Sequence, residues 1–436
     1  MGSLYFILNM LTPKIYVAVC GLVDSGKSTL IKTATEVISG RKILIDSLCN
    51  EQNKSITIKQ ASIDCPYKNI DIIFLDCPGH KEFKDEIKSG LSKAQYIIRI
   101  IDCEREQESL EYQKFINGIK NRLNLDDIKE TFIFSKAKVL SDSHYNVSNK
   151  EHFSTFVSNL VENIKKSTRP IISPVDSAIR VIKDSFKLSK CKNPTLMCSY
   201  GKDSIVLLDL MKKAGCLDKV KILYMRSPFD MDGISEEYKD NIKKFFNVEI
   251  HPFDGIPEGW DFSNHSVKEI MAAKSQAIKN VIKENDSEIT FVGARRHEGD
   301  GTRSKDKFFS PRDKDGNANL SATSFEQFGY EYKTVEGIDY SNCRVSPILD
   351  FTEIDIWKYT LHNNLPVCSD YFSKNGLRYR SLGDKDTTTP IKSNATTIEE
   401  MIEELKKSTE TERVCRKVQD SSEKFAMENI RSIGFF

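Results

Sequence analysis

The sequence predicts an α/β protein with two doubly wound domains on one chain. Two phosphate-binding loops carry this prediction, a G-x-x-x-x-G-K-S loop at residues 21–28 and an S-x-G-K-D-S loop at residues 199–204. Each loop stands between an apolar strand and a helix. The length of 436 residues agrees, because a domain usually takes roughly 100–200 residues. We place the domains at residues 1–175 and 176–436.

The composition narrows the class of protein. Charged residues make up 29% of the chain and the formal net charge is +1, which gives no overall bias toward nucleic acid or membrane. The 11 cysteines include no C-x-x-C pair, so neither a disulfide framework nor a zinc ribbon is indicated. The apolar run at residues 4–8 is too short for a membrane span and lacks a basic leader. We expect a cytoplasmic protein with no nucleic-acid or membrane partner.

The first loop has the surroundings that its motif requires. A β-branched strand at residues 15–19 precedes it and a helix at residues 28–37 follows. Its glycines let successive N–H groups point at phosphate oxygens, the lysine adds a positive charge, and the serine hydroxyl can ligate Mg²⁺. The nucleotide-binding residues expected here are Gly21, Asp24, Ser25, Gly26, Lys27, Ser28 and Thr29.

A second motif belongs to the same site. The apolar strand at residues 72–75 ends in Asp76-Cys77-Pro78-Gly79-His80. The Asp76 carboxylate can hold Mg²⁺ through water, and the Gly79 N–H can contact a γ-phosphate. We expect this motif and the first loop to lie on adjacent strand ends.

These motifs, together with Lys54-Ser55-Ile56-Thr57-Ile58, resemble the translation-factor class of P-loop GTPases. That class includes elongation factor Tu and the large subunit of bacterial sulfate adenylyltransferase. The resemblance implies GTP and Mg²⁺ as cofactors, with Ser28, Thr57 and Asp76 at the metal. It also implies that Thr57 closes over the γ-phosphate and that His80 is catalytic, positioning the attacking water.

The sequence departs from this class where guanine would be recognised. The usual N-K-x-D motif is replaced by Ser135-Lys136-Ala137-Lys138, after a strand at residues 131–134. Lys138 stands where a carboxylate accepts two hydrogen bonds from guanine, and an ammonium group has no acceptor. The choice between GTP and another nucleoside triphosphate therefore stays open. The second loop also follows too soon to leave room for the β-barrel domains of translation factors.

The second half of the chain predicts a parallel sheet. A helix at residues 177–187, a strand at residues 194–198 and a helix at residues 205–213 surround the second loop. Further strands are expected at residues 221–225, 247–250 and 288–292. A ligand of such a sheet lies at the carboxyl ends of the strands, where the second loop and the turn Gly293-Ala294-Arg295-Arg296 both fall.

The residue types of the second loop suit adenylyl transfer. Backbone N–H groups, the hydroxyls of Ser199 and Ser204 and the ammonium of Lys202 can surround the β and γ phosphates of ATP and leave the α-phosphorus open to attack. Guanidinium groups nearby can bind sulfate or pyrophosphate, although a solvated charged loop is the competing interpretation. The catalytic candidates are Ser199, Lys202, Ser204, Arg295 and Arg296, and the nucleotide-binding candidates are Gly201, Asp203, Arg303, Lys305 and Arg312, with Lys307 in the same basic run.

This half resembles the small, catalytic subunit of bacterial sulfate adenylyltransferase, a PP-loop ATP pyrophosphatase related to phosphoadenosine phosphosulfate reductases. The matching stretches are residues 293–298, 302–313, 345–357 and 379–383, within a likeness from about residue 176 to the end that includes Glu412-Arg413 and residues 432–436. The resemblance implies an adenine nucleotide α-hydrolase-like fold that joins ATP and sulfate into adenylyl sulfate, coupled to nucleotide hydrolysis in the first domain. Tyr224-Met225-Arg226-Ser227 departs from the family's His-Val-Asp-Thr.

Other functions stay open. The second domain could adenylate a different acceptor, or the chain could be a regulatory nucleotide sensor with a degenerate GTPase domain. Sulfonucleotide reduction is disfavoured, because it needs a cysteine on the terminal tail and Cys415 is the last one. We expect a homo-oligomer with sulfate as substrate, and a separate GTPase subunit is a further candidate partner.

Two later segments are expected to be helical. Thr352 caps a helix whose Ile356 and Trp357 pack inward, so we assign that segment a structural role. A Thr-capped amphipathic helix is expected over residues 396–407. The polar stretch at residues 408–422 has two interpretations, a solvated segment or, from the resemblance, a loop that reaches the active site.

Overall fold

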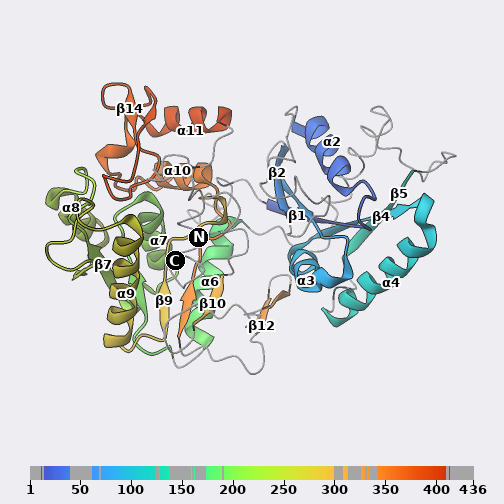
Figure 1. Cartoon of the computed structure of the whole chain (residues 1–436), viewed down its shortest axis with the longest axis horizontal. Coiled ribbons are helices and arrows are strands. Elements are labelled where there is room, and N and C mark those ends of the chain that lie inside the picture. The colour runs from blue at the N-terminus through green and yellow to red at the C-terminus, as the bar shows by residue number, and fades with distance from the viewer. Residues whose placement is uncertain are drawn as a thin grey trace. The chain divides into compact units, whose positions relative to one another are not determined.

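The computed structural model describes most of both predicted domains (Figure 1). The described residues are 11, 14–39, 61–67, 70–123, 125, 128–136, 159, 162, 173–188, 191–298, 308–312, 326–328, 331–333, 342–408 and 412.

The chain divides into two compact units. The N-terminal unit comprises Thr12–Ser173 and Phe325–Lys333, and the C-terminal unit comprises Met1–Leu11, Pro174–Ser324 and Thr334–Phe436. The main division thus falls between Ser173 and Pro174, close to the break expected after residue 175. The hairpin of strands β11 (Glu326–Phe328) and β12 (Glu331–Lys333) groups with the N-terminal unit, although the sequence suggested no such exchange.

The sheet of the N-terminal unit has the order β2-β3-β1-β4-β5. Strand β2 runs antiparallel to β3, and the other pairs are parallel. The strands expected at residues 15–19, 72–75 and 131–134 are all present. The five strands are β1 (Lys14–Cys20), β2 (Ala61–Tyr67), β3 (Ile70–Asp76), β4 (Tyr96–Asp102) and β5 (Lys129–Ser135).

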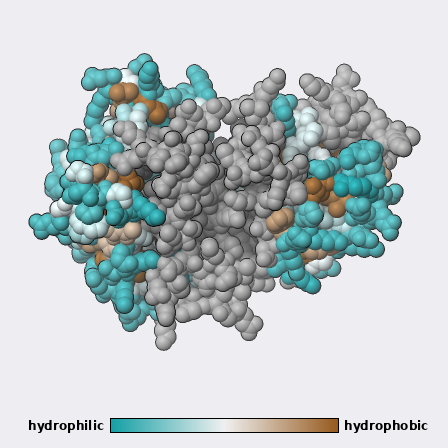
Figure 2. All heavy atoms as spheres, in the orientation of Figure 1, coloured by the Kyte–Doolittle hydropathy of each residue, from teal (hydrophilic) through white to brown (hydrophobic). Residues whose placement is uncertain are grey.

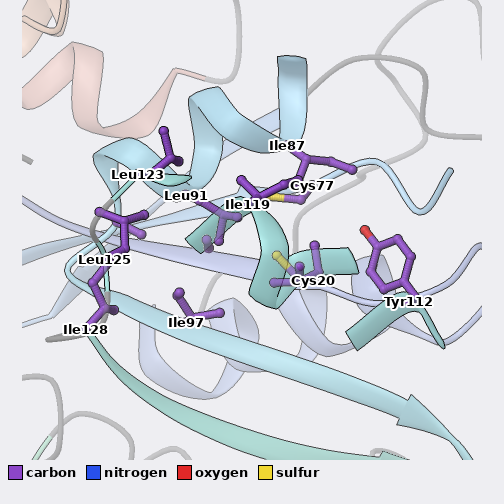
Figure 3. Close-up of a cluster of buried hydrophobic side chains, with 13 residues drawn as sticks. Cys20, Cys77, Ile87, Leu91, Ile97, Tyr112, Ile119, Leu123, Leu125 and Ile128 are labelled. Carbon is purple, nitrogen blue, oxygen red and sulfur yellow. The ribbon is translucent and has the colours of Figure 1, made fainter. Parts of the chain in front are cut away.

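Helices cover this sheet on both sides. Helix α2 (Lys27–Ser39) lies on one side, and α3 (Lys84–Lys93) and α4 (Glu106–Arg122) lie on the other (Figure 1). The side chains of Ile87 and Leu91 from α3 and of Tyr112 and Ile119 from α4 pack with Ile97 of the sheet in one buried cluster (Figure 3). This packing holds the carboxyl ends of β1, β3 and β4 in register.

The sheet of the C-terminal unit has the order β10-β13-β9-β6-β7-β8, with only β10 antiparallel to its neighbour. Chain order reverses between β6 and β9, which makes that point the crevice where such sheets bind ligands. The strands are β6 (Thr195–Met197), β7 (Lys221–Arg226), β8 (Ile250–Asp254), β9 (Ile289–Phe291), β10 (Phe309–Pro311) and β13 (Cys343–Val345), with a separate pair β14 (Leu377–Arg378) and β15 (Ile391–Lys392). The helices are α6 (Pro174–Leu188), α7 (Lys202–Lys213), α8 (Glu236–Phe246), α9 (Val267–Glu284), α10 (Glu353–His362) and α11 (Ile398–Lys407).

One expected strand is misplaced. Residues 247–250 were expected to form it, but β8 begins only at Ile250. The reason is Asn247, which ends α8 in the left-handed conformation with φ of 53°. Asparagine tolerates that conformation and commonly terminates helices in this way. The two expected α/β domains are otherwise confirmed.

Caps define the two late helices. Thr352 caps α10 as expected: its side chain accepts a hydrogen bond from Asp355 N, and Asp355 reciprocates. Both Ile356 and Trp357 are buried. The cap of α11 is Thr397 rather than Thr396, because the Thr397 Oγ1 accepts from Glu400 N at 3.2 Å.

The surface agrees with the composition. Hydrophilic residues cover most of the coloured surface in Figure 2. Within the described part of the chain, no helix is both long enough and apolar enough to cross a membrane.

The cap of α11 leads to a prediction. Thr397→Ala removes the hydroxyl that satisfies a first-turn N–H, so it should lower the free energy of unfolding of the C-terminal unit by about 1 kcal/mol. Thr396→Ala is the matched control: its hydroxyl contacts only the Glu400 side chain, at 3.1 Å, and the loss should be smaller. Urea denaturation followed by circular dichroism measures both. A larger loss for Thr396→Ala would contradict the cap assignment.

Candidate functional site

The first loop and the Asp76 motif meet at one sheet edge, as expected. Strands β1 and β3 pair in parallel with Val19 opposite Asp76. The Ser28 Oγ donates to Asp76 Oδ2 at 2.8 Å, which joins the two motifs directly. The loop turns sharply, because Asp24 and Gly26 have positive φ values of 59° and 90°.

Lys27 lies inside this loop. Its Nζ donates to the carbonyl oxygens of Gly21 at 3.1 Å and Leu22 at 2.7 Å. Burial lowers the pKa of Lys27, although Asp76 opposes the shift. Because its partners are neutral carbonyls, the ammonium keeps a positive charge that an entering phosphate can use.

Gly79 packs directly against the first loop. A Cβ at this position would lie 2.6 Å from the Leu22 carbonyl carbon and closer still to the Val23 nitrogen. Only glycine therefore lets the two motifs approach this far. The neighbouring His80 has an exposed side chain that makes no capping hydrogen bond, so it is free to face solvent at this edge.

The chemistry of this site suits a hydrated magnesium ion with a nucleotide phosphate. Two buried oxygens, Asp76 Oδ1 and Ser25 Oγ, have no hydrogen-bond partner among the described residues. Burial holds the pKa of Asp76 above its ordinary value, although Lys27 and Ser28 partly offset this increase. In the described part of the chain no group of three or more His, Cys, Asp or Glu side chains could hold a metal, so Ser28 and Asp76 would need phosphate and water as further ligands. Thr57 lies outside the described residues.

An ion cluster that the sequence did not predict lies near this loop. The buried Asp102 carboxylate, at the end of β4, contacts Lys136 Nζ at 2.9 Å and Arg105 Nη2 at 2.9 Å. Arg105 also donates to the carbonyl of Val23 in the first loop. These contacts tie the loop after β5, where guanine would be recognised, to the phosphate loop. Lys138 lies outside the described residues.

The second loop begins helix α7 at the crevice between β6 and β9. Tyr200 adopts a left-handed conformation with φ of 58°, which turns the chain sharply before the helix. Gly201 N donates to Ser199 Oγ at 3.4 Å, and Ser204 Oγ donates to Gly201 O at 2.9 Å. Gly293, after β9, lies against the start of α7: a Cβ there would be 3.2 Å from Ser204 N. The start of α7 therefore lies close against the carboxyl end of β9.

Lys202 is buried under this loop. Its side chain is 1% exposed, and its Nζ contacts Glu412 Oε1 at 2.5 Å, Arg380 O at 3.0 Å and Asp203 Oδ2 at 3.4 Å. Burial alone would lower the pKa of Lys202, but the Asp203 and Glu412 carboxylates raise it above its ordinary value. The Tyr371 hydroxyl accepts from Lys202 N at 3.0 Å.

Arg295 joins Lys202 through shared carboxylates. Its side chain is fully buried, its Nε donates to Asp203 Oδ1 at 2.6 Å, and its Nη2 donates to Glu412. Its Nη1 is buried without a hydrogen-bond partner among the described residues. Burial would raise the pKa of Glu412, but Lys202 and Arg295 lower it to about 2.

Some of the other predicted site residues contact groups away from Lys202, and others lie outside the described residues. Arg296 points elsewhere: its Nε donates to Asp350 Oδ1 at 2.7 Å, and its guanidinium lies 5.7 Å from the centre of the Phe308 ring. Arg226 forms an exposed ion pair with Asp254 at 2.9 Å. Arg312 is half-buried after β10. Arg303, Lys305 and Lys307 lie outside the described residues.

Of the groups that surround Lys202 and Arg295, Asp203 was a predicted binding residue and Glu412 was matched only through the resemblance. Glu412 stands in the polar stretch 408–422, where its buried side chain is at odds with the solvated interpretation. Glu353 was assigned a helix-start role, yet it also forms a buried ion pair with Arg380 at 2.7 Å. No sequence pattern indicated that Tyr371 would contact the second loop. Tyr371 lies far from the second loop in the sequence and in no stretch that the resemblance matched, whereas Glu353 and Glu412 lie in matched stretches.

The fold and the two loops define a two-domain nucleotide-binding protein of the α/β class. Comparison with protein families agrees: residues 12–130 match the elongation factor Tu GTP binding domain, and residues 193–390 match the phosphoadenosine phosphosulfate reductase domain. The chain therefore joins a domain that matches the elongation factor Tu GTP binding domain to a domain that matches the phosphoadenosine phosphosulfate reductase domain.

Curated relatives are similar over more than half of the chain. A protein named sulfate adenylyltransferase subunit 2 from Aeromonas salmonicida is 28% identical over 285 residues, covering 56% of this chain and 89% of its own. Proteins of the same name from Parabacteroides distasonis and Bacteroides thetaiotaomicron are 27% and 28% identical, each covering 56% of this chain and 91% of its own. A solved structure from Thermus thermophilus aligns with 29% of this chain at a TM-score of 0.24, too low to support any argument.

The low pKa of Glu412 leads to a prediction. A carboxylate whose pKa falls from 4.5 to about 2 on folding contributes about 3 kcal/mol, fully present above the unfolded value and lost as pH falls toward the folded value. Glu412→Gln should therefore lower the thermal midpoint of the C-terminal unit most at pH 6–7, a range well above about 4.5, and least near pH 3. Calorimetry measures the difference, with exposed Glu399→Gln as control. A difference that grows on acidification would contradict the prediction.

Proposed function

We propose that this chain is a sulfate adenylyltransferase that forms adenylyl sulfate and pyrophosphate from ATP and sulfate. The observation that carries the proposal is the buried pair Lys202 and Arg295 at the start of α7, on a sheet of the phosphoadenosine phosphosulfate reductase family. The names of the curated relatives support sulfate as the acceptor.

The start of α7 is suited to the leaving group. The helix dipole favours anions at this end. The β and γ phosphates of ATP would lie against Gly201, Ser204 and the Lys202 ammonium. As a sulfate oxygen bonds to the α-phosphorus, the bond from that phosphorus to the bridging oxygen breaks, and the electron pair leaves with pyrophosphate. Lys202 then stabilises the charge that develops on the leaving group.

Arg295 is suited to the oxyanions on the other side of the reacting phosphorus. Its orphan Nη1 is a buried donor that an incoming oxygen would satisfy, and leaving such a donor unpaired is unfavourable. A guanidinium binds sulfate or phosphate through two parallel hydrogen bonds. Arg295 therefore orients the attacking group, and its fixed contact with Asp203 keeps it in place.

The N-terminal unit would hydrolyse GTP or another nucleoside triphosphate and couple that hydrolysis to sulfate activation. Lys27 and Ser28 hold the phosphates, and Ser28 with Asp76 would hold Mg²⁺, which neutralises phosphate charge when bound. His80 is the candidate for orienting the attacking water. Because Gly79 packs against the first loop, a γ-phosphate bound by that loop would lie next to the Asp76 motif.

The adenylyl-transfer proposal is tested with Lys202→Ala. The variant should lose sulfate-dependent pyrophosphate release from ATP by about 100-fold or more, because the leaving group loses a buried charge. Lys213→Ala is the matched control: Lys213 ends the same helix but contacts Tyr359 and Asn363 instead. Its activity should stay near wild type. Wild-type release that does not depend on sulfate would point to another acceptor, and full activity in Lys202→Ala would refute the site assignment.

The hydrolysis proposal is tested with Lys27→Ala. This variant should lose nucleoside triphosphate hydrolysis by about 100-fold or more, since the charge on the phosphates is removed. Phosphate release from GTP and from ATP, each with and without sulfate, measures hydrolysis, base preference and coupling. Lys32→Ala, an exposed lysine on the same helix, is the control. Failure of wild-type protein to hydrolyse either nucleotide would contradict a working switch.

A further inference from the structure

The cations of the second loop are sealed from solvent. Lys202 is 1% exposed, Arg295 is fully buried, and the Glu412 side chain that touches both is 4% exposed. An anionic substrate cannot reach either cation while the three side chains hold these positions. Binding therefore requires that one of them moves.

The contacts of Lys202 identify which group can move. An ammonium has three donor positions, and the three contacts here are Glu412, the Arg380 carbonyl and Asp203. The Arg380 carbonyl is backbone beside strand β14. Asp203 is the next residue of α7, so the helix backbone fixes its position, whereas Arg295 contacts both carboxylates. Glu412 lies beyond α11, the last helix of the described chain, so it belongs to neither the sheet nor α7.

The charge balance around Lys202 and Arg295 also identifies Glu412 as the group that moves. The positive charges of Lys202 and Arg295 face the negative charges of Asp203 and Glu412, so the four side chains balance to zero. The buried Glu298 carboxylate, which accepts from Arg295 N at 2.8 Å, adds a further negative charge, so the site offers an approaching polyanion no net attraction. Removing the Glu412 carboxylate would leave one net positive charge on the other three of the four side chains.

We propose that the Glu412 carboxylate occupies the position that a phosphate or sulfate oxygen of the substrate takes, so that the ligand binds by displacing it. Glu412 is thus a built-in competitor of the anionic substrate. The inference rests on the proposed function for the class of ligand, a pyrophosphate-bearing nucleotide. This competition sets a minimum affinity that a ligand must have. Weak anions cannot replace a carboxylate that bonds both cations, whereas a polyphosphate that also contacts the start of α7 can.

The test measures binding rather than turnover. Isothermal titration calorimetry of inorganic pyrophosphate should give a dissociation constant at least about tenfold lower for Glu412→Gln than for wild type, because ligand no longer has to break two charged hydrogen bonds. Glu353→Gln is the matched control, since it removes the same charge from the same buried cluster but contacts Arg380 instead of Lys202. Its dissociation constant should change by less than about threefold. The exposed Glu399→Gln controls for net charge.

Two outcomes would overturn the inference. Weaker or unchanged pyrophosphate binding in Glu412→Gln would mean that Glu412 positions the cations for the ligand. Equal tightening in Glu353→Gln would mean that the local field, and not occupation of the site, sets the affinity.

A measurement on the wild-type protein needs no variant to fold. Hydrogen–deuterium exchange of the peptide that contains Glu412 should increase when saturating pyrophosphate is added, because a displaced side chain no longer anchors it. Greater protection on binding would instead mean that Glu412 closes over the ligand, and would refute displacement. Both readouts are independent of the acceptor. If tight pyrophosphate binding follows the prediction but no adenylyl sulfate forms, the proposed function fails while the inference stands.

Discussion

The structure of the C-terminal unit depends on the burial of Lys202 and Arg295 at the start of α7. A buried cation is strongly destabilising unless opposite charges and hydrogen bonds compensate it. Asp203 and Glu412 supply the charges, and the Tyr371 hydroxyl and the Arg380 carbonyl complete the contacts of Lys202. This requirement brings together residues that span more than 200 positions of the chain. The ion pair of Arg380 with Glu353 extends the network to α10.

The two phosphate loops meet the same requirement differently. Lys27 rests on the carbonyls of Gly21 and Leu22, which are neutral, so its charge stays available at the loop. Lys202 rests on carboxylates, so its charge is neutralised until a ligand competes. On the proposed displacement, the first loop would accept an anion directly and the second would accept one by exchange for the Glu412 carboxylate.

Much of the fold was predictable, because strands β1, β3, β5, β6, β7 and β9 are short apolar runs beside loops of known chemistry. The error at residues 247–250 has a local cause, the left-handed Asn247 that ends α8. The site was less predictable. Arg295 and Arg296 were both expected at the site, but Arg295 contacts Asp203 and Glu412, whereas Arg296 contacts Asp350. Two adjacent arginines cannot be told apart by composition, because the backbone decides which one enters the crevice.

The sequence by itself determined the two α/β domains, the two phosphate loops and the loss of the guanine-reading carboxylate at Lys138. Each follows from residues within about 20 positions of one another, where spacing and residue type limit the chemistry. Only the tertiary structure decided that Glu412 neutralises Lys202 and Arg295, and that Asp102, Arg105 and Lys136 tie the base-side loop to the first phosphate loop. The physical reason is that charge compensation acts through space: a buried cation takes whichever carboxylate the fold brings within hydrogen-bonding distance.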